Sequence, residues 1–332
     1  MNRAGTRPPA FSAHGQGPGA GLRHEALLCQ GQADCVASVL PFIHEWLARA
    51  QAVLVGVSAG LARQLRQQVD EQSAVSFFDM TELGRNPGRI IPAMLDFAGT
   101  NPGRALRYVS QPFWAGRPAA ENVEAGRHEA LIELALAGCR ATVLCVYDLA
   151  TLDQAALGCA EQTHPVIISG GRTRSSRGYA GTGVVPPQCD RPLAPPPRSA
   201  TRLAYSADLR QLRTLVTDCA ASAGLAPGRT ADMVLAASEV AANTLRHARA
   251  DGMLQVWHTR REIICQITDP GVIRDPLAGR RRPGPAASGQ GLWVVNQVCD
   301  LVELRSGPDG TIVRMHIRLP GLTLTGPGRS RP

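Results

Sequence analysis

A carboxylate and an amide stand four residues apart in one alanine-rich run of the chain. The run reads Ser238-Glu239-Val-Ala-Ala-Asn243-Thr-Leu-Arg-His247-Ala, and its apolar spacing predicts one long helix that opens at Pro227. Residues four apart share a helix face, so Glu239, Asn243 and His247 are predicted to form a single stripe. A carboxylate and an amide on one face can hold a divalent metal ion and a phosphate.

Three short glycine-containing motifs follow this run: Asp269-Pro-Gly271, Gly289-Gln-Gly291-Leu292 and Gly310-Thr311. Glycine lets the backbone approach a ligand closely, and Gly289 is predicted to open a helix whose free amides favour anions. Each motif alone is weak evidence for a ligand site, because a Glu-x-x-x-Asn stripe is usually a solvated helix face and Asp-Pro-Gly is usually a turn. Their order along predicted helix, strand pair, glycine loop, helix and strand pair makes them informative together.

In that order the motifs resemble the ATP-binding (GHKL, or Bergerat) fold shared by gyrase, the chaperone Hsp90, histidine kinases and MutL repair proteins. Within that superfamily they are most similar to the anti-sigma serine kinases, in which a helix carries Glu-x-x-x-Asn and ends in His-Ala. The resemblance covers residues 201–320 and implies a two-layer α/β sandwich that binds ATP and Mg²⁺. On the phosphate side it implies Asn243 as ligand of the magnesium, Glu239 as general base toward a protein hydroxyl, and Gly289 and Gly291 with Leu292 closing over the phosphates. On the adenine side it implies Asp269 as acceptor from the adenine amino group, Gly271 beside the ring and Thr311 completing the pocket.

One departure concerns the adenine-binding motif. The family usually has a second glycine two positions after the first, whereas this chain reads Gly271-Val272-Ile273. The segment that follows holds Arg280, Arg281 and Arg282. Three arginines could clamp phosphates, or they could form a solvated basic loop.

The resemblance implies a cytoplasmic anti-sigma-type regulator. Such a protein phosphorylates a serine or threonine of an anti-anti-sigma (STAS-type) protein, sequesters a sigma factor, or does both. The alternative is a catalytically inactive, nucleotide-dependent protein-binding module in transcriptional regulation. A two-component histidine kinase fits poorly, because no helical hairpin with a phosphoacceptor histidine precedes the ATP-binding region. Direct nucleic-acid binding is disfavoured because no groove-reading element is visible.

Composition bounds these hypotheses. The 332 residues suffice for two domains, and 44% hydrophobic residues indicate a globular chain. All 35 basic residues counted as Lys+Arg are arginines, and the net charge of +8 favours phosphates or acidic proteins as partners. The nine cysteines contain no Cys-x-x-Cys pair, so the spacing predicts no zinc site and we expect reduced thiols. Neither a signal peptide nor a membrane span is predicted.

Residues 23–169 alternate between predicted strands and helices. Strands are expected at 52–57, 75–78, 106–109 and 142–147, and helices around 36–47, 61–69 and 130–136, with a further helix starting at Asn86-Pro87. This βαβ series predicts a three-layer domain with a buried parallel sheet. A glycine-containing loop follows the strand at 52–57, but it lacks the Gly-Lys-Ser/Thr ending of a phosphate-binding loop.

This region resembles the MEDS sensory domain through His24-Glu-Ala-Leu-Leu, Arg127-His-Glu129-Ala-Leu, Val143-Leu-Cys145-Val-Tyr147-Asp148 and His164-Pro165-Val-Ile. We expect Cys145, Tyr147 and Asp148 at the carboxyl end of a central strand, where open α/β sheets bind ligands. His24 and His164 could join them in a pocket for a small molecule. Taken singly, His24 could equally cap a helix, Cys145 pack in the core and Asp148 cap the next helix.

The remaining segments are expected to lack a core. Residues 170–200 are rich in Gly, Pro and Arg and predict a poorly ordered linker. Residues 1–22 and 321–332 predict disordered tails. With a linker of this length, coupling between the two domains could run through a partner or a homodimer.

Overall fold

The computed structural model describes residues 21–70, 74–283 and 290–320. The chain divides into two compact units, Met1–Arg191 and Pro192–Pro332. Residues 1–20 of the predicted N-terminal tail, all of the predicted tail 321–332 and Gly289 lie outside the described residues.

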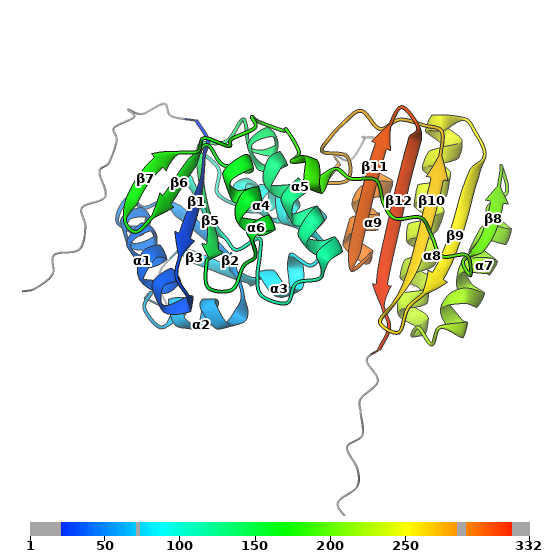
Figure 1. Ribbon diagram of the computed structural model, residues 1–332, viewed down its shortest axis with the longest axis horizontal. Helices are drawn as coiled ribbons and strands as arrows, with labels where there is room; N and C mark the ends of the chain where they lie inside the picture. Colours follow the sequence, from blue (N-terminus) through cyan, green and yellow to red (C-terminus); the bar gives the residue numbers. More distant parts are fainter. Residues whose placement is uncertain (1–20, 71–73, 284–289, 321–332) are drawn as a thin grey trace, which may run out of the picture. The chain divides into compact units, whose positions relative to one another are not determined.

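The N-terminal unit is built on a seven-stranded sheet in the order β3-β2-β4-β5-β1-β6-β7 (Figure 1). Neighbouring strands are parallel except that β7 runs antiparallel to β6. The strands are β1 (Arg23–Cys29), β2 (Ala52–Val57), β3 (Val75–Asp79), β4 (Leu106–Ser110), β5 (Ala141–Asp148), β6 (Val166–Ser169) and β7 (Arg172–Ser175). Strands β2 and β5 are almost continuous apolar runs, because both faces of a parallel sheet are covered by helices.

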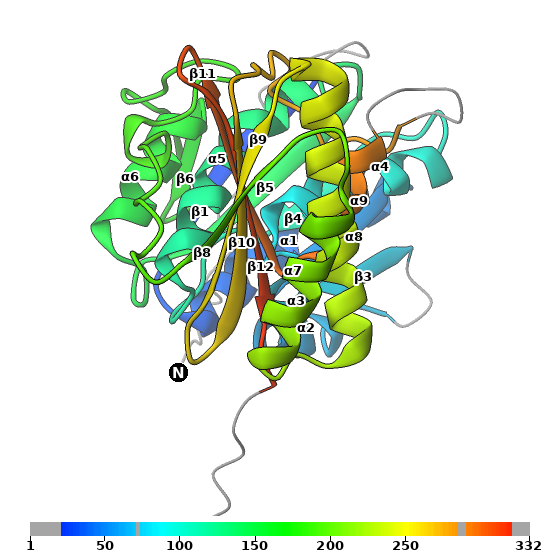
Figure 2. The same cartoon turned by 90° about the vertical axis from the view of Figure 1, so that its right-hand side faces the viewer.

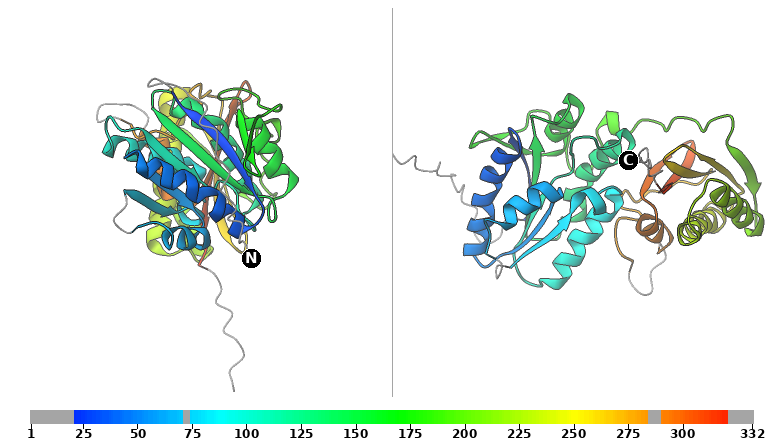
Figure 3. Two further views of the ribbon diagram at one scale, coloured as in Figure 1. Left: turned by 90° about the vertical axis from the view of Figure 1, so that its left-hand side faces the viewer. Right: turned by 90° about the horizontal axis from the view of Figure 1, so that it is seen from below.

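Two apolar cores lie on opposite faces of this sheet. One face is covered by α1 (Gln32–Ala48) and α2 (Ala59–Arg66), of which α1 is the blue helix in the left view of Figure 3. The other face is covered by α3 (Met80–Leu83), α4 (Ile90–Thr100), α5 (Ala119–Ala135) and α6 (Gln154–Thr163). Strand β5 contributes to both, since Leu144 and Val146 belong to the α1 core and Cys145 and Tyr147 to the α5 core. The predicted three-layer parallel α/β domain is confirmed.

The sequence pattern missed two details of this unit. His24 lies in the central strand β1 rather than at a helix cap. Asn86 does cap a turn, through its side-chain Oδ1 and the Gly88 amide, but the turn is the short 3-10 helix η1 (Pro87–Arg89) that precedes α4.

The first part of the predicted linker is a structured part of the N-terminal unit. Strand β7 pairs with β6, and the amides of Ala180 and Gly183 donate to the Gln162 and Ala130 carbonyls. Farther along, a 3-10 turn η2 (Pro187–Cys189) buries Cys189. The prediction of a poorly ordered linker is wrong for this part, because main-chain pairing and one buried side chain order a segment that is rich in Gly, Pro and Arg.

One cysteine pair departs from the expected reduced state. Cys29 ends β1 and Cys35 lies in the first turn of α1, and a disulfide joins them with their Cα atoms 5.1 Å apart. The strand-to-helix turn brings the two residues within the range that a disulfide requires. The expectation of reduced thiols is therefore wrong for this pair.

The C-terminal unit is a two-layer sandwich. Its antiparallel sheet has the order β11-β12-β10-β9-β8, and Figure 2 shows its helices gathered on one face. The elements are β8 (Thr201–Tyr205), α7 (Arg210–Ser222), α8 (Pro227–Asn243), β9 (Gly252–His258), β10 (Glu262–Asp269), α9 (Gln290–Val298), β11 (Leu301–Gly307) and β12 (Gly310–Arg318). One core fills the space between the layers, with Val216, Met233, Val240 and Val295 from the helices. The predicted fold class is confirmed.

The helix that carries Glu239 and Asn243 is not one continuous α-helix. It begins at Pro227 as expected, but α8 ends at Asn243 and continues as a π-helical turn, η3 (Thr244–Ala248). Arg249 then closes the turn in the left-handed conformation, with φ of 50°. The expected spacing of 3.6 residues per turn therefore does not extend to His247. Such π-turns are frequent at functional sites.

Within the described ranges, no helix has both the length and the apolar character needed to cross a membrane.

Candidate functional site

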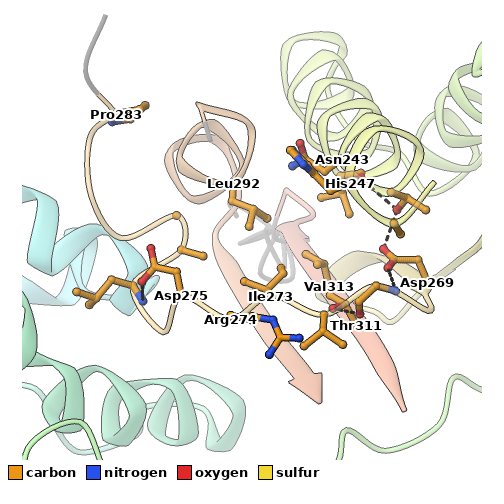
Figure 4. A pocket seen from close by; sticks show the side chains of 18 of the residues that line it. Asn243, His247, Asp269, Ile273, Arg274, Asp275, Pro283, Leu292, Thr311 and Val313 are labelled. Atoms are coloured by element: carbon orange, nitrogen blue, oxygen red, sulfur yellow. Dashed lines mark hydrogen bonds between the residues drawn. The ribbon is translucent and has the colours of Figure 1, made fainter. Parts of the chain in front are cut away.

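A cavity of about 480 Å³ opens between the helices and the sheet of the C-terminal unit. Figure 4 shows Asn243 and His247 on one side, Leu292 of α9 on another, and Asp269 with Thr311 at the sheet. The segment from Gly271 to Pro283 supplies the remaining wall. Six of the predicted ATP-site residues meet around this space or at its edge: Asn243, Asp269, Gly271, Gly291, Leu292 and Thr311.

Asp269 is held at the base of the cavity by two hydrogen bonds. Its Oδ1 accepts from the Gly271 amide at 2.7 Å, which makes the Asp-Pro-Gly segment a tight turn. Its Oδ2 accepts from Thr244 Oγ1 at 2.7 Å, and Tyr205 donates to the same threonine hydroxyl at 3.0 Å. A carboxylate has about four acceptor sites, so Asp269 can still accept from a ligand.

Thr311 is placed beside this turn by the register of the sheet. Asp269 of β10 pairs with Thr311 of β12, and Thr311 Oγ1 donates to the Gly271 carbonyl at 2.8 Å. Gly310 before it has φ of 111°, and a Cβ there would lie 2.3 Å from the Asp269 carbonyl oxygen. Only glycine fits this position, which explains the Gly310-Thr311 motif.

Glu239 and Asn243 lie close to Gly291 of α9. A Cβ on Gly291 would lie 2.9 Å from Glu239 Oε2 and 3.0 Å from Asn243 Nδ2. Both side chains are half-buried and sit one helical turn apart on α8. The structure therefore places a carboxylate and an amide side by side at the start of the helix that follows the glycine segment.

The arginines predicted as a phosphate clamp separate in the structure. Arg281 lines the cavity, as does Arg274, which was not predicted. The Arg282 guanidinium instead stacks over Trp293, 5.3 Å from the ring centroid.

The departure in the adenine-binding motif has a visible consequence. Ile273 occupies the position where the family usually has its second glycine, and it lines the cavity. Its amide donates to Ser306 Oγ at 2.8 Å, which fixes the backbone there. Val272, between Gly271 and Ile273, also borders the cavity but is 49% exposed. An isoleucine side chain therefore takes up space that glycine would leave to a ligand.

These groups fit a nucleotide with a divalent cation. The cavity has the size of a small-molecule site. Asp269 offers a free acceptor site in a wall of apolar side chains such as Val240 and Val313, which suits a flat heterocycle that carries an amino group. The Asn243 amide oxygen at the rim is a ligand type that Mg²⁺ accepts together with phosphate oxygens.

A second group of predicted residues meets inside the N-terminal unit. His24, Cys145 and His164 lie together on the face of the sheet that α5 and α6 cover, and all three are fully buried. Tyr147 lies beside them and donates to a carboxylate at 3.2 Å. That carboxylate belongs to Glu129 of α5, which was expected only as part of a family motif and not as a site residue.

Asp148 lies elsewhere. Its Oδ1 accepts from the amides of Gly31 and Ala150, so it fixes the turns that follow β1 and β5. Because side chains alternate along a strand, Cys145 and Tyr147 share one face of β5 and Asp148 does not. The group of buried residues therefore sits between sheet and helices, below the carboxyl edge where it was expected.

The charges in this group are strongly coupled. Burial alone would raise the pKa of the Glu129 carboxyl, but the neighbouring His164 and His24 hold that pKa well below its usual range. Burial raises the pKa of the Cys145 thiol and of the Tyr147 phenol, and the Glu129 charge raises both further. Burial lowers the pKa of His24, with His164 contributing.

Family models agree with this division of the chain. Residues 23–165 match MEDS, the "MEthanogen/methylotroph, DcmR Sensory domain", and residues 203–317 match the "Histidine kinase-like ATPase domain". A solved structure of the ATPase domain of another protein is 11% identical over 45% of this chain and 68% of its own, with a TM-score of 0.30. Similarity at that level supports no conclusion. Comparison with curated proteins gave no match.

The two domain matches together support a regulatory protein with an ATP-binding fold. Its N-terminal unit is a MEDS domain, and its C-terminal unit is a histidine kinase-like ATPase domain.

Proposed function

We propose that the C-terminal domain binds Mg-ATP and transfers its γ-phosphoryl group to a serine or threonine of an anti-anti-sigma (STAS-type) protein, under the control of the MEDS domain. The observation that carries this proposal is the meeting of Glu239 and Asn243 beside Gly291, with Asn243 and Asp269 both lining the cavity. A carboxylate beside the metal ligand is what phosphoryl transfer uses to orient or deprotonate the attacking group.

The residues divide into those that hold the base and those that hold the phosphates. Asp269 and Thr311 would orient the adenine, since both are fixed by hydrogen bonds to the Gly271 turn. Asn243 would hold the magnesium ion, which neutralises phosphate charge during transfer. Arg274 and Arg281 line the same cavity and would add positive charge along the phosphates.

Glu239 would orient or deprotonate the attacking hydroxyl. Phosphoryl transfer depends mostly on positioning and charge neutralisation, and a carboxylate beside the metal ligand can accept the hydroxyl proton. Glu239 lies one helical turn before Asn243 and close to Gly291, so the acceptor hydroxyl would enter from the open rim of the cavity. The acceptor must therefore be a flexible segment or a surface serine of another protein.

The same surface could also sequester a sigma factor. The second candidate function is protein binding without phosphotransfer. Ile273 favours the second candidate, because its side chain lines the cavity where the family usually has a glycine in close approach to the ligand. A domain with weak ATP affinity and tight protein binding would follow from that substitution. Cytoplasmic location and homodimerisation belong to the same proposal.

Phosphotransfer can be tested with the full chain, Mg²⁺ and γ-labelled ATP, using purified STAS-type proteins of the same genome as acceptors. The proposal predicts label on an acceptor serine or threonine with the wild-type chain and none with Glu239→Gln. Unlabelled acceptor that nevertheless forms a stable complex with the chain would select the binding module. Label that persists in Glu239→Gln would remove the general-base assignment.

A further inference from the structure

The strongest unassigned feature of the molecule is the buried polar group of the MEDS domain, here called the His–Glu–Cys cluster: His24, Glu129, Cys145 and His164. Its members come from four separate elements, namely β1, α5, β5 and the residue that ends α6. These elements belong to one unit and are labelled in Figure 1. The exposed fraction of each residue is 1% or less.

One potential ligand atom from each residue lies within 4.8 Å of the other three. Cys145 Sγ and His24 Nε2 are 3.5 Å apart, His164 Nε2 and Glu129 Oε2 are 3.1 Å apart, and His24 Nε2 and Glu129 Oε2 are 3.7 Å apart. Tetrahedral bonds of about 2.0–2.3 Å around one ion place neighbouring ligand atoms roughly 3.3–3.6 Å apart. These three separations lie around that spacing, and the remaining pairs, within 4.8 Å, would close further on an ion.

The orientation of His164 is fixed by its other ring nitrogen. Nδ1 lies 3.0 Å from the Ala160 carbonyl oxygen, which can only accept, so Nδ1 carries the proton. The lone pair of neutral His164 is therefore on Nε2, which faces Glu129. Fixing the tautomer through a carbonyl is how metal-binding histidines are usually held.

His24 is held less closely, because its Nδ1 has a carboxylate near it but makes no hydrogen bond. Its Nδ1 lies 3.8 Å from Glu133 Oε1, which leaves Nε2 toward Cys145 and Glu129. Glu133 is in turn held at its other oxygen by the hydroxyls of Tyr179 and Thr182. A carboxylate behind a histidine is a frequent outer partner in zinc sites.

Polar atoms of the cluster remain unsatisfied within the described residues. His164 Nε2 and Glu129 Oε1 are buried without a well-aligned hydrogen-bond partner. Their nearest polar neighbours are Glu129 Oε2, 3.1 Å from His164 Nε2, and the buried His128 Nε2, 3.6 Å from Glu129 Oε1. Such atoms are costly in a protein interior unless something satisfies them. A divalent ion would do so, and with one thiolate, one carboxylate and two neutral imidazoles the site would carry no net charge.

We propose that the His–Glu–Cys cluster binds one divalent transition-metal ion, with the preference for nitrogen and sulfur that Zn²⁺ shows. All four positions come from the protein, so the ion is held in a closed site rather than one that binds substrate. Binding would release the Cys145 thiol proton to solvent and form the sulfur–metal bond. The site is independent of the ATP cavity and of the function proposed for it.

The test begins with the metal content of the purified full chain. A closed site predicts about one transition-metal ion per chain after dialysis against a weak chelator. The chain is then unfolded in the presence of a strong chelator, which removes the bound metal, and refolded with Co²⁺ in buffer free of thiol reductants. Thiolate coordination gives a sulfur-to-cobalt charge-transfer band, which cobalt bound at the ATP cavity through oxygen ligands does not give.

Two cysteine variants locate the thiolate. Cys145→Ser is expected to abolish the charge-transfer band. Cys159→Ser is the matched control, because Cys159 is also a buried thiol of this domain and has Cys189 beside it. The band should persist in that control, and its loss there together with survival in Cys145→Ser would overturn the assignment.

Thermal stability supplies a readout that does not require a variant to fold. Zn²⁺ at about a hundredfold excess over its dissociation constant should raise the Tm of the metal-free chain by roughly 5–10 °C. Glu133→Gln, at a half-buried position, should weaken Zn²⁺ binding roughly tenfold while the chain stays folded. A natively folded chain that holds no metal as purified, shows no cobalt band and gains no stability from Zn²⁺ would overturn the proposal.

Discussion

The two domains place their chemically active side chains in opposite surroundings. In the ATPase domain, Asn243 and Asp269 line an open cavity, and half-buried Glu239 lies one helical turn before Asn243, beside Gly291. In the MEDS domain, the His–Glu–Cys cluster is closed on all sides. The first arrangement suits a ligand that arrives and leaves, whereas the second suits a group that stays bound.

The same difference appears in how the histidines are satisfied. His316 of the ATPase domain has a carboxylate at each ring nitrogen, with Glu262 at 3.1 Å and Glu303 at 2.9 Å. His164 of the MEDS domain has one nitrogen bonded to a carbonyl, and the other points into a group that also contains a thiol. His316 therefore has two aligned acceptors and is a charged structural residue. His164 Nε2 faces Glu129 Oε2 at 3.1 Å without hydrogen-bond geometry, which is the arrangement of two ligands turned toward one ion.

The largest effect is expected from Glu239→Gln, which tests whether the open rim is catalytic. The variant keeps the shape of the side chain but removes its charge and its ability to accept a proton. Phosphotransfer should fall by roughly 10²–10⁴-fold. ATP affinity, measured by calorimetry, should stay within about twofold, because Glu239 is not expected to contact the nucleotide. Equal losses of affinity and transfer would make Glu239 a ligand of the metal rather than a base.

Asp269→Asn tests whether the closed end of the same cavity recognises the base. The amide can still accept from the Gly271 amide, so the turn should persist. ATP binding should weaken by roughly 10–100-fold, since a charged hydrogen bond is worth about 1.5–3 kcal/mol. Exposed Asp251 offers a control, and Asp251→Asn should bind ATP like the wild type. Equal affinity of the Asp269 and Asp251 variants would contradict the placement of adenine.

Gly291→Ala tests how tightly the rim is packed. The added methyl group would meet Glu239 Oε2 at 2.9 Å and Asn243 Nδ2 at 3.0 Å, and both side chains would have to move. Magnesium-dependent ATP affinity should fall several-fold with little loss of stability, because both contacts are ends of flexible side chains. Gly228→Ala on α8 meets nothing within 4 Å and should leave ATP binding unchanged. Unchanged binding in both variants would show that the rim does not hold the phosphates.

The smallest effect concerns His316. Burial alone would lower its pKa, but hydrogen bonds to Glu262 and Glu303 raise it above its usual value, and His316 in turn lowers the pKa of Glu303 against the effect of burial. The contribution of His316 to the free energy of unfolding is complete below pH about 6.5 and is lost as pH rises through its raised pKa. The contribution of Glu303 is complete above pH about 4.3 and is lost as pH falls through its lowered pKa. Denaturant unfolding of the full chain should therefore show that His316→Gln costs roughly 1–2 kcal/mol between pH about 4.5 and 6.5 and less at pH about 8. A cost that does not change with pH would contradict a charged His316.

Much of the fold could be predicted because local patterns determine it. The continuous apolar runs at 52–57 and 142–147 predict buried parallel strands, and the structure confirms them as β2 and β5. The Gly310-Thr311 motif marks a position that only glycine fits. By contrast, β7 and the turn at Pro187–Cys189 depend on pairing with residues far away in the sequence, so composition alone predicted a linker.

The two sites also differ in how much of each could be predicted from the sequence. The cavity of the C-terminal domain brings together residues that the sequence also groups, because they occur as short motifs in a fixed order. In the His–Glu–Cys cluster, His24, Cys145 and His164 were expected to share a pocket, but the addition of Glu129 and the spacing of a metal site appear only when the folded sheet brings four elements together. The absence of Cys-x-x-Cys therefore could not decide whether the chain binds a metal ion. Glu129 was missed because nothing in its helix distinguishes a buried carboxylate from a solvated one.

The most direct test of the central claim is ATP binding to the full chain by calorimetry, with and without Mg²⁺, beside Asn243→Ala. We expect binding that magnesium strengthens, and in the variant a loss of that magnesium-dependent affinity by roughly tenfold or more. Absence of binding at millimolar ATP, in a chain whose circular dichroism shows it to be folded, would contradict a functional nucleotide site and leave the domain as a protein-binding module.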